Sequence, residues 1–148
     1  MPESPIDLES ADPAAIYAAI AEMDDDEFDQ LMVDPEKRPR VIGAMVDHMV
    51  TLFRPDHAEG IDAVIHVKLW DKPGGGYDHF ELLIADRNCR ISEPPEREPD
   101  LTLKVRPGDL RKLVTGESGP RRLALKGRLR VLGDLGLGMK LPELFAFG

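Results

Sequence analysis

The 148-residue chain has one cysteine, one tryptophan and few aromatic residues, which make up 5% of it. The single cysteine, Cys89, excludes an internal disulfide and leaves the redox compartment unconstrained. No apolar run approaches the roughly 20 residues that a membrane-spanning helix needs. The N-terminus lacks the basic and apolar regions of a secretory signal. These absences predict a cytoplasmic protein.

Basic residues are absent from residues 1–36, which contain twelve Asp and Glu residues. The remaining residues carry 16 acidic and 19 basic side chains, so the formal charge of the chain is −9. An acidic N-terminal part argues against general nucleic-acid binding, because that activity requires a basic face. From residue 101 onward ten basic residues outnumber four acidic ones, so the sequence allows a local contact with an anion in this part of the chain.

The length and composition are those of one globular domain. A chain of this length buries roughly 68–70% of its unfolded surface, enough for a core and a cavity. Hydrophobic residues make up 42% and charged residues 32%. We expect one domain over residues 1–148, with a helical acidic part at 1–55 and a sheet with a C-terminal helix at 61–148.

Three helices are predicted in the N-terminal part. Asp12 followed by Pro13 is typical of a helix start. The acidic run at 24–27 favours a second start, because acidic side chains stabilise the positive end of the helix dipole. Two prolines, Pro35 and Pro39, then precede a third helix over about residues 40–53.

Alternating apolar residues predict strands at 61–71, 77–86, 89–92, 101–105 and about 123–131. The first two strands form a hairpin in which odd-numbered residues face even-numbered ones. Arg87 and Asn88 predict a tight turn, and residues 107–115 predict a helix closed by Gly116. The predicted fold is therefore α+β, with a five-stranded, mainly antiparallel sheet and helices over one face.

A glycine-rich segment follows the last strand. Gly133 ends the strand and Asp134 is a good N-cap for the terminal helix. Pro142 predicts that this helix ends, kinks or restarts near residue 141. The glycine spacing, GxxGxG, differs from the dinucleotide-binding pattern and lacks its βαβ context, so close backbone packing is the better explanation.

Four pieces in this order resemble the sterol carrier protein type 2 domain family. They are the strand PDLTL at 99–103, the helix DLRKLVTG at 109–116, the strand end GRLRVLGD at 127–134 and LGLGMKL at 135–141. The resemblance covers the last third of the chain well and the middle third loosely.

The resemblance implies an apolar tunnel between the sheet and its helices, with the last helix beside its mouth and Met139 near the ligand. Sterols, fatty acids, acyl-CoA esters and phospholipids are the implied ligand classes. The expected ligand-binding residues are Ile65, Val67, Leu69, Phe80, Leu82, Ile84, Leu103, Val105, Leu125, Leu129, Val131, Leu137, Met139 and Leu141. Periodicity alone favours a packed core for the same side chains.

Candidates for catalysis and metal binding are few. The four histidines show no ligand spacing, and the predicted register does not put His66 opposite His79. Cys89 has no evident base beside it, and no GxSxG or Walker sequence is present. We expect no metal and no cofactor.

A basic group near the last strand has two interpretations. Its members are Arg111, Lys112, Arg121, Arg122, Lys126, Arg128 and Arg130. These side chains could meet a CoA phosphate or an anionic lipid surface. Alternation along a strand explains Lys126, Arg128 and Arg130 equally as its solvated face.

The expected function is a carrier that reversibly buries a fatty acyl, acyl-CoA or sterol-like ligand. The expected partner is thus an apolar small molecule, without nucleic acid and with at most transient membrane contact. Two alternatives stay open. The cavity could hold an apolar substrate of an enzyme or a biosynthetic accessory protein, or the acidic N-terminus could dock a basic partner.

Overall fold

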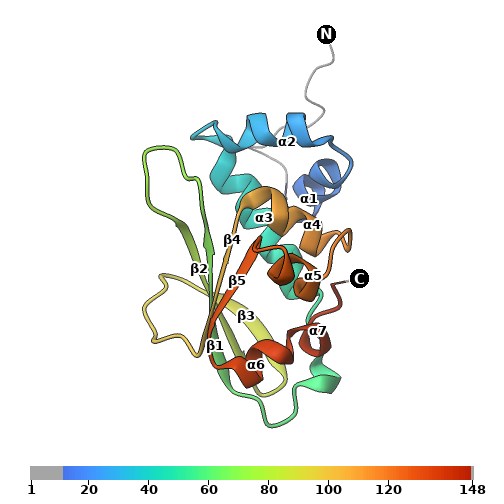
Figure 1. The fold of residues 1–148 in the computed structure, drawn as a ribbon, viewed down its shortest axis with the longest axis vertical. Coiled ribbons are helices and arrows are strands. Elements are labelled where there is room, and N and C mark those ends of the chain that lie inside the picture. The colour runs from blue at the N-terminus through green and yellow to red at the C-terminus, as the bar shows by residue number, and fades with distance from the viewer. Residues whose placement is uncertain (1–11, 148) are drawn as a thin grey trace.

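The computed structural model describes residues 12–147 as an α+β fold, as the sequence predicts. Its sheet is built from the strands β1 (Ala63–Leu69), β2 (Asp78–Ala85), β3 (Asn88–Ser92), β4 (Leu101–Val105) and β5 (Leu129–Gly133). The strand order is β3-β2-β1-β4-β5, and every neighbouring pair is antiparallel except β1 with β4. The helices gather on one side of this sheet (Figure 1). No helix within residues 12–147 is long and apolar enough to cross a bilayer.

The first two helices begin at the predicted caps. The Asp12 carboxylate caps α1 (Pro13–Ala21) by accepting a backbone hydrogen bond of 2.8 Å from its first turn. α2 (Asp25–Met32) begins with a capping box, in which Asp24 and Glu27 each accept a hydrogen bond from the other's backbone N–H. These local signals confirm the two helix starts.

The third helix, α3 (Lys37–Thr51), begins earlier than the sequence predicts. Pro39 lies in its first turn, where a missing N–H costs no helical hydrogen bond. A short 3₁₀ turn (Pro55–His57) follows this helix and leads into the sheet.

The hairpin register agrees with the prediction. Ile65 pairs with Leu82 and Val67 pairs with Phe80, so odd-numbered residues face even-numbered ones. The next turn is shifted by one residue, because positive φ angles occur at Asp86 (52°) and Arg87 (60°), not at Arg87 and Asn88. Two central residues with positive φ give a hairpin turn whose twist matches the flanking strands.

The segment before β5 corrects the sequence prediction of a continuous strand. Residues from 120 instead form α5 (Pro120–Leu125), and Gly127, at φ +74°, lies in the turn between this helix and β5. Alternating leucines over less than two helical turns do not separate the strand period from the helical period. Leu125 is therefore not on the apolar face of the sheet, and its side chain is 90% exposed.

Two short helices follow β5, α6 (Leu135–Met139) and α7 (Leu141–Leu144). Asp134 caps α6 as predicted, and its carboxylate accepts a hydrogen bond of 3.1 Å from the Leu137 N–H. Pro142 lies in the first turn of α7, which confirms a restart at this point.

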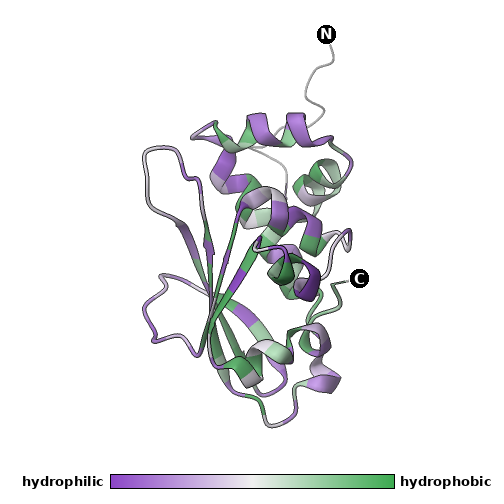
Figure 2. Cartoon of the chain, viewed as in Figure 1, coloured by the Kyte–Doolittle hydropathy of each residue, from purple (hydrophilic) through white to green (hydrophobic). Residues whose placement is uncertain are grey.

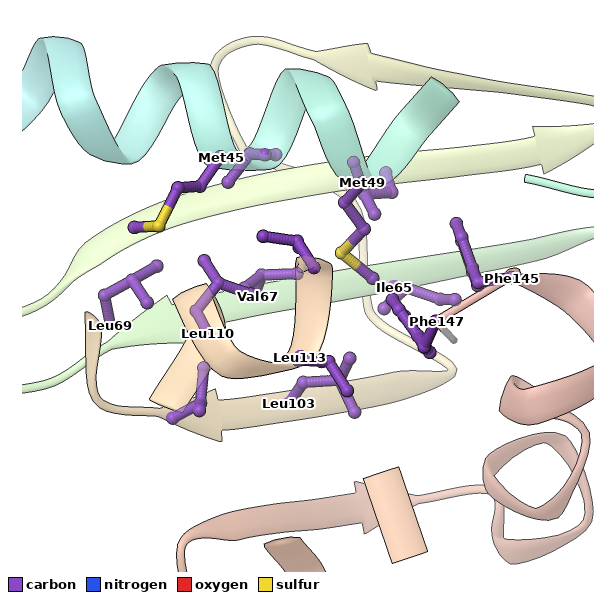
Figure 3. Close-up of a cluster of buried hydrophobic side chains, with 14 of the residues drawn as sticks. Met45, Met49, Ile65, Val67, Leu69, Leu103, Leu110, Leu113, Phe145 and Phe147 are labelled. Carbon is purple, nitrogen blue, oxygen red and sulfur yellow. The ribbon is translucent and has the colours of Figure 1, made fainter. Parts of the chain in front are cut away.

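The core lies between the sheet and two covering helices, α3 and α4 (Pro107–Val114). Figure 3 shows Met45 and Met49 of α3 and Leu110 and Leu113 of α4 in one cluster with side chains of the strands. These four side chains and the sheet residues Ile65, Val67, Leu69 and Leu103 are each 2% exposed or less. In Figure 2 hydrophobic residues, coloured green, occur both on the strands and on the helices that cover them.

Candidate functional site

Most of the expected ligand-binding residues lie in the core just described. Ten of them are buried: Ile65, Val67, Leu69, Leu82, Ile84, Leu103, Val105, Leu129, Leu137 and Leu141. Phe80 and Val131 are partly buried against the same core, whereas Leu125 and Met139 are exposed. The helices α3 and α4 thus fill the space over the central strands with their own side chains.

An apolar groove of about 510 Å³ lies at the β5 edge of the sheet. Its walls come from α5, β5, α6 and α7, and its lining residues are Pro120, Arg121, Ala124, Val131, Leu135, Gly138, Met139, Leu141 and Pro142. Volumes of 300–1,000 Å³ with predominantly apolar walls are typical of small-molecule sites. We call this feature the β5 groove.

Three of the expected residues line the β5 groove: Val131, Met139 and Leu141. The other wall, α5, was not predictable from the alternating leucines, which predict a strand there. The dipeptide Gly119-Pro120 was the available signal, since proline favours the first helical position.

Glycines let α6 lie directly against β5. A Cβ atom on Gly138 would come within 2.9 Å of Val131 Cγ1. A Cβ atom on Gly133, whose φ is +111°, would come within 2.5 Å of the Asp100 carbonyl oxygen. These contacts confirm close backbone packing as the role of the glycine-rich segment, and they bring the groove walls together.

The opposite face of the sheet holds a buried polar chain. Glu81 is fully buried and accepts hydrogen bonds from the Arg97 N–H (2.8 Å), the Arg97 guanidinium (2.9 Å) and the Glu96 N–H (3.1 Å). His66 Nε2 is 3.2 Å from Glu81 Oε1, and His79 Nε2 is 2.8 Å from His66 Nδ1. The carboxylate only accepts, so His66 donates through Nε2, and in the neutral imidazole its Nδ1 accepts from His79 Nε2.

The predicted register is therefore right about strand pairing and incomplete about contact. His66 pairs with Glu81 and His79 pairs with Lys68, but the two histidines meet diagonally. Glu81 connects the loop at 93–99 to the sheet. The hydrogen-bonded side chains His79, His66 and Glu81 therefore have a structural role.

Two pKa shifts follow from this arrangement. Burial acts to raise the pKa of Glu81, but the hydrogen bonds from Arg97, His66 and Glu96 outweigh it and lower the pKa to about 2. Burial lowers the pKa of His79, and the neighbouring His66 and Lys68 side chains act in the same direction. The deprotonated form of each of these two side chains therefore stabilises the folded state.

We expect replacement of Glu81 by Gln to lower the free energy of unfolding at pH 7. The free energy of unfolding of this variant should also decrease less than that of the wild type as the pH falls. The Glu81 contribution is complete above the usual pKa of 4.5 and is lost as the pH falls toward about 2. Denaturant unfolding of both proteins between pH 7 and pH 3 checks this. The control is Glu59→Gln, whose exposed ion pair with Arg87 contributes little. Parallel wild-type and Glu81→Gln curves would contradict the role of Glu81.

Cys89 and His48 offer no reactive centre. Burial raises the pKa of the Cys89 thiol to about 12, so the nucleophilic thiolate is not formed near neutral pH. His48 stacks on Tyr17 with ring centroids 3.5 Å apart, and burial lowers its pKa. Within residues 12–147 no group of three or more His, Cys, Asp and Glu side chains could hold a metal ion.

A second cleft, of about 370 Å³, lies between α2 and the start of α4. Its charged side chains largely satisfy one another, because Arg106 pairs with Asp71 at 3.0 Å and Arg128 pairs with Asp109 at 3.4 Å. Arg111, also near α2, pairs with Asp25 and lies over the Phe28 ring at 5.0 Å. These pairs join α4 to α2 and to neighbouring loops, so the cleft is largely occupied by its own charges, and the apolar β5 groove is the better candidate for an apolar ligand.

Comparisons with known proteins agree with this fold. Residues 51–146 match the SCP-2 sterol transfer family. Sterol carrier protein 2 of Oryctolagus cuniculus is 27% identical over 84 residues, which cover 57% of this chain and 15% of that protein. The chain thus matches only a small part of that relative.

Two solved structures share the fold. The sterol carrier protein domain 2 of Helicoverpa armigera is 19% identical, with a TM-score of 0.57, and the match covers 70% of this chain and 83% of that one. Palmitated SCP2L2 from Aedes aegypti is 15% identical, with a TM-score of 0.52, and the match covers 67% of this chain and 88% of that one. Since the family match extends over well more than half of its residues, the chain belongs to the SCP-2 sterol transfer family.

Proposed function

We propose that this protein is a lipid carrier which reversibly holds one elongated apolar ligand, such as a fatty acyl chain or a sterol, in the β5 groove. The whole chain acts as one cytoplasmic lipid-binding domain in this proposal. The observation that carries it is an apolar groove of about 510 Å³ in a member of the SCP-2 sterol transfer family. The palmitate named in the Aedes aegypti structure supports an acyl chain as one ligand class.

The energetics suit reversible binding. Burial of about 15 methylene groups would contribute about 12 kcal/mol at about 0.8 kcal/mol each. Association costs of about 4–15 kcal/mol leave a net of at most about 8 kcal/mol, so the affinity reaches the micromolar range at the lowest cost. A carrier needs such an affinity, because it must also release its ligand.

The proposed ligand contacts are the apolar groove residues. Leu141, which is buried, and Val131, which packs against the core, form the floor. Ala124 on α5 faces Leu135 and Met139 on α6 across the groove in this assignment. The other expected residues, apart from the exposed Leu125, belong to the core on which the groove rests.

Native mass spectrometry of protein purified from cells, followed by extraction of bound lipid, is the first test. A discrete added mass that extracts as fatty acid, sterol or phospholipid is the expected result. Protein that carries no lipid and also fails to take up fluorescent fatty acid and sterol analogues would overturn the proposal.

Replacement of Ala124 by Trp should weaken uptake of a fluorescent fatty acid roughly tenfold or more, because the indole fills the groove and displaces several methylene contacts. Ala124 is exposed, so the substitution leaves the core intact. The matched control is Ala18→Trp on the exposed side of α1, away from the groove, with an expected change below twofold. Equal affinities for the two variants would place the ligand elsewhere.

A further inference from the structure

Exposed apolar side chains gather at the mouth of the β5 groove. Leu135 and Met139 line the groove and are 70% and 72% exposed, and Leu125, next to Ala124 on the α5 wall, is 90% exposed. We call Leu125, Leu135 and Met139 the apolar rim. Only three other large apolar residues within residues 12–147 are exposed: Val33, Tyr77 and Leu132. Such a concentration around a cavity mouth marks a surface that contacts something apolar.

Basic charge gathers in the same segment. Residues 120–142 contain six Lys and Arg residues and one acidic residue, Asp134, in a chain whose formal charge is −9. Arg128 is paired with Asp109. The other five form no ion pair within residues 12–147, and they are Arg121, Arg122, Lys126, Arg130 and Lys140.

Four of these five lie on the helical side of the groove and make up what we call the basic rim: Arg121, Arg122, Lys126 and Lys140. Lys126 is the C-cap of α5 and not a strand residue, which corrects the explanation by strand alternation. In Figure 2, α5 carries strongly hydrophilic residues while α6 is mainly hydrophobic. The basic rim and the apolar rim therefore lie on the same helices that wall the groove, and Arg121, Leu135 and Met139 line it directly.

We infer that this face docks on an anionic lipid membrane, with the groove mouth toward the bilayer. Apolar side chains that insert beside cations which contact headgroups are the usual composition of a membrane-surface site. A small anion would occupy one point, whereas the basic rim spans α5 and the junction of α6 with α7. The inference deepens the proposed function, because a groove that opens on the bilayer exchanges its ligand without exposing it to water.

The acidic remainder of the chain orients this contact. Twelve acidic residues and no basic ones lie within residues 1–36, and those of them on α2 are in a different part of the molecule from α6 (Figure 1). Anionic headgroups repel the acidic residues of α2 and attract the basic rim, so the protein approaches the surface with the groove first. Salt weakens this attraction, because it is screened within about 8 Å at physiological ionic strength.

Sedimentation of the full chain with lipid vesicles tests the inference. We expect binding to vesicles of phosphatidylcholine with 30% phosphatidylserine to exceed binding to pure phosphatidylcholine roughly tenfold or more, and to fall steeply with added salt. The double variant Arg122→Glu with Lys126→Glu should lose roughly tenfold or more of this binding. Neither residue lines the groove, so fatty acid uptake in vesicle-free solution should be unchanged.

A matched control removes the effect of total charge. The double variant Lys72→Glu with Arg90→Glu makes the same change of charge at two exposed residues outside the rim, and it should bind vesicles within twofold of wild type. Leu125→Ser tests the apolar rim separately, and it should weaken vesicle binding without changing its salt dependence.

Three results would overturn the inference: equal binding to anionic and neutral vesicles, equal losses in the two double variants, or a dimer in solution that Arg122→Glu with Lys126→Glu dissociates. The last result would make this face a contact between two copies of the chain. Vesicle binding without any lipid uptake would instead contradict the proposed function and leave the docking surface standing.

Discussion

Replacement of Arg38 by methionine is expected to lower the free energy of unfolding by about 3–5 kcal/mol, as removal of one partner from a buried ion pair does. Arg38 is 3% exposed, and its Nε donates a 2.8 Å hydrogen bond to Asp78 Oδ2. Its guanidinium also donates to the carbonyl groups of Met32, Trp70 and Asp71. The substitution leaves all four acceptors without their donor and separates α3 from the β1–β2 hairpin. Urea unfolding followed by circular dichroism measures the loss.

Two comparisons show that the loss comes from the position of the guanidinium. Lys37→Met changes the neighbouring residue, whose exposed pair with Asp34 is 4.0 Å long, and should cost less than about 1 kcal/mol. Arg38→Lys keeps the charge but loses the planar set of donors, so we expect it to recover only part of the stability. If the Arg38→Met protein were as stable as Lys37→Met, the ion pair and hydrogen bonds of Arg38 would contribute nothing to the free energy of unfolding. Arg38 does not line the β5 groove, so the folded fraction should still take up lipid.

Replacement of Gly133 by alanine is the second large effect, with an expected loss of about 2–6 kcal/mol and weaker ligand uptake. The φ of +111° is unfavourable for any residue with a Cβ atom, which costs roughly 1–3 kcal/mol. The new methyl group also overlaps the Asp100 carbonyl oxygen at 2.5 Å, and such overpacking costs roughly 1–3 kcal/mol more. Relief requires β5 to move away from β4, which displaces the groove floor. Thermal unfolding and fatty acid titration of the same sample measure both effects.

The control is Gly108→Ala in the first turn of α4. No atom lies within 4 Å of a Cβ placed there, and its φ is not positive. Alanine should therefore be neutral or stabilise the helix by up to about 1 kcal/mol. A Gly133→Ala protein as stable as Gly108→Ala would show that β5 and β4 separate at no cost, contrary to the packing described above.

Local chemistry in the sequence determined much of the fold. Asp12, Asp24 and Asp134 cap helices where the sequence predicts them, because a cap depends on only three or four consecutive residues. The odd-to-even register of β1 and β2 was also predictable, since a shift by one residue would turn every apolar side chain to the wrong face. The family resemblance, carried by segments in the last third, is confirmed by the match over residues 51–146.

Tertiary structure decided the rest. The identity of α5 depends on Pro120 and on contacts with β5, because six residues are too few for periodicity to separate helix from strand. Glu81 alternates like a solvated strand residue, yet it is fully buried because the distant loop at 93–99 folds over it. The position of the groove was not predictable for the same reason. The alternation of apolar residues in the sequence identifies which side chains face away from water. The packing of α3 and α4 then determines which of these side chains belong to the core and which line the β5 groove.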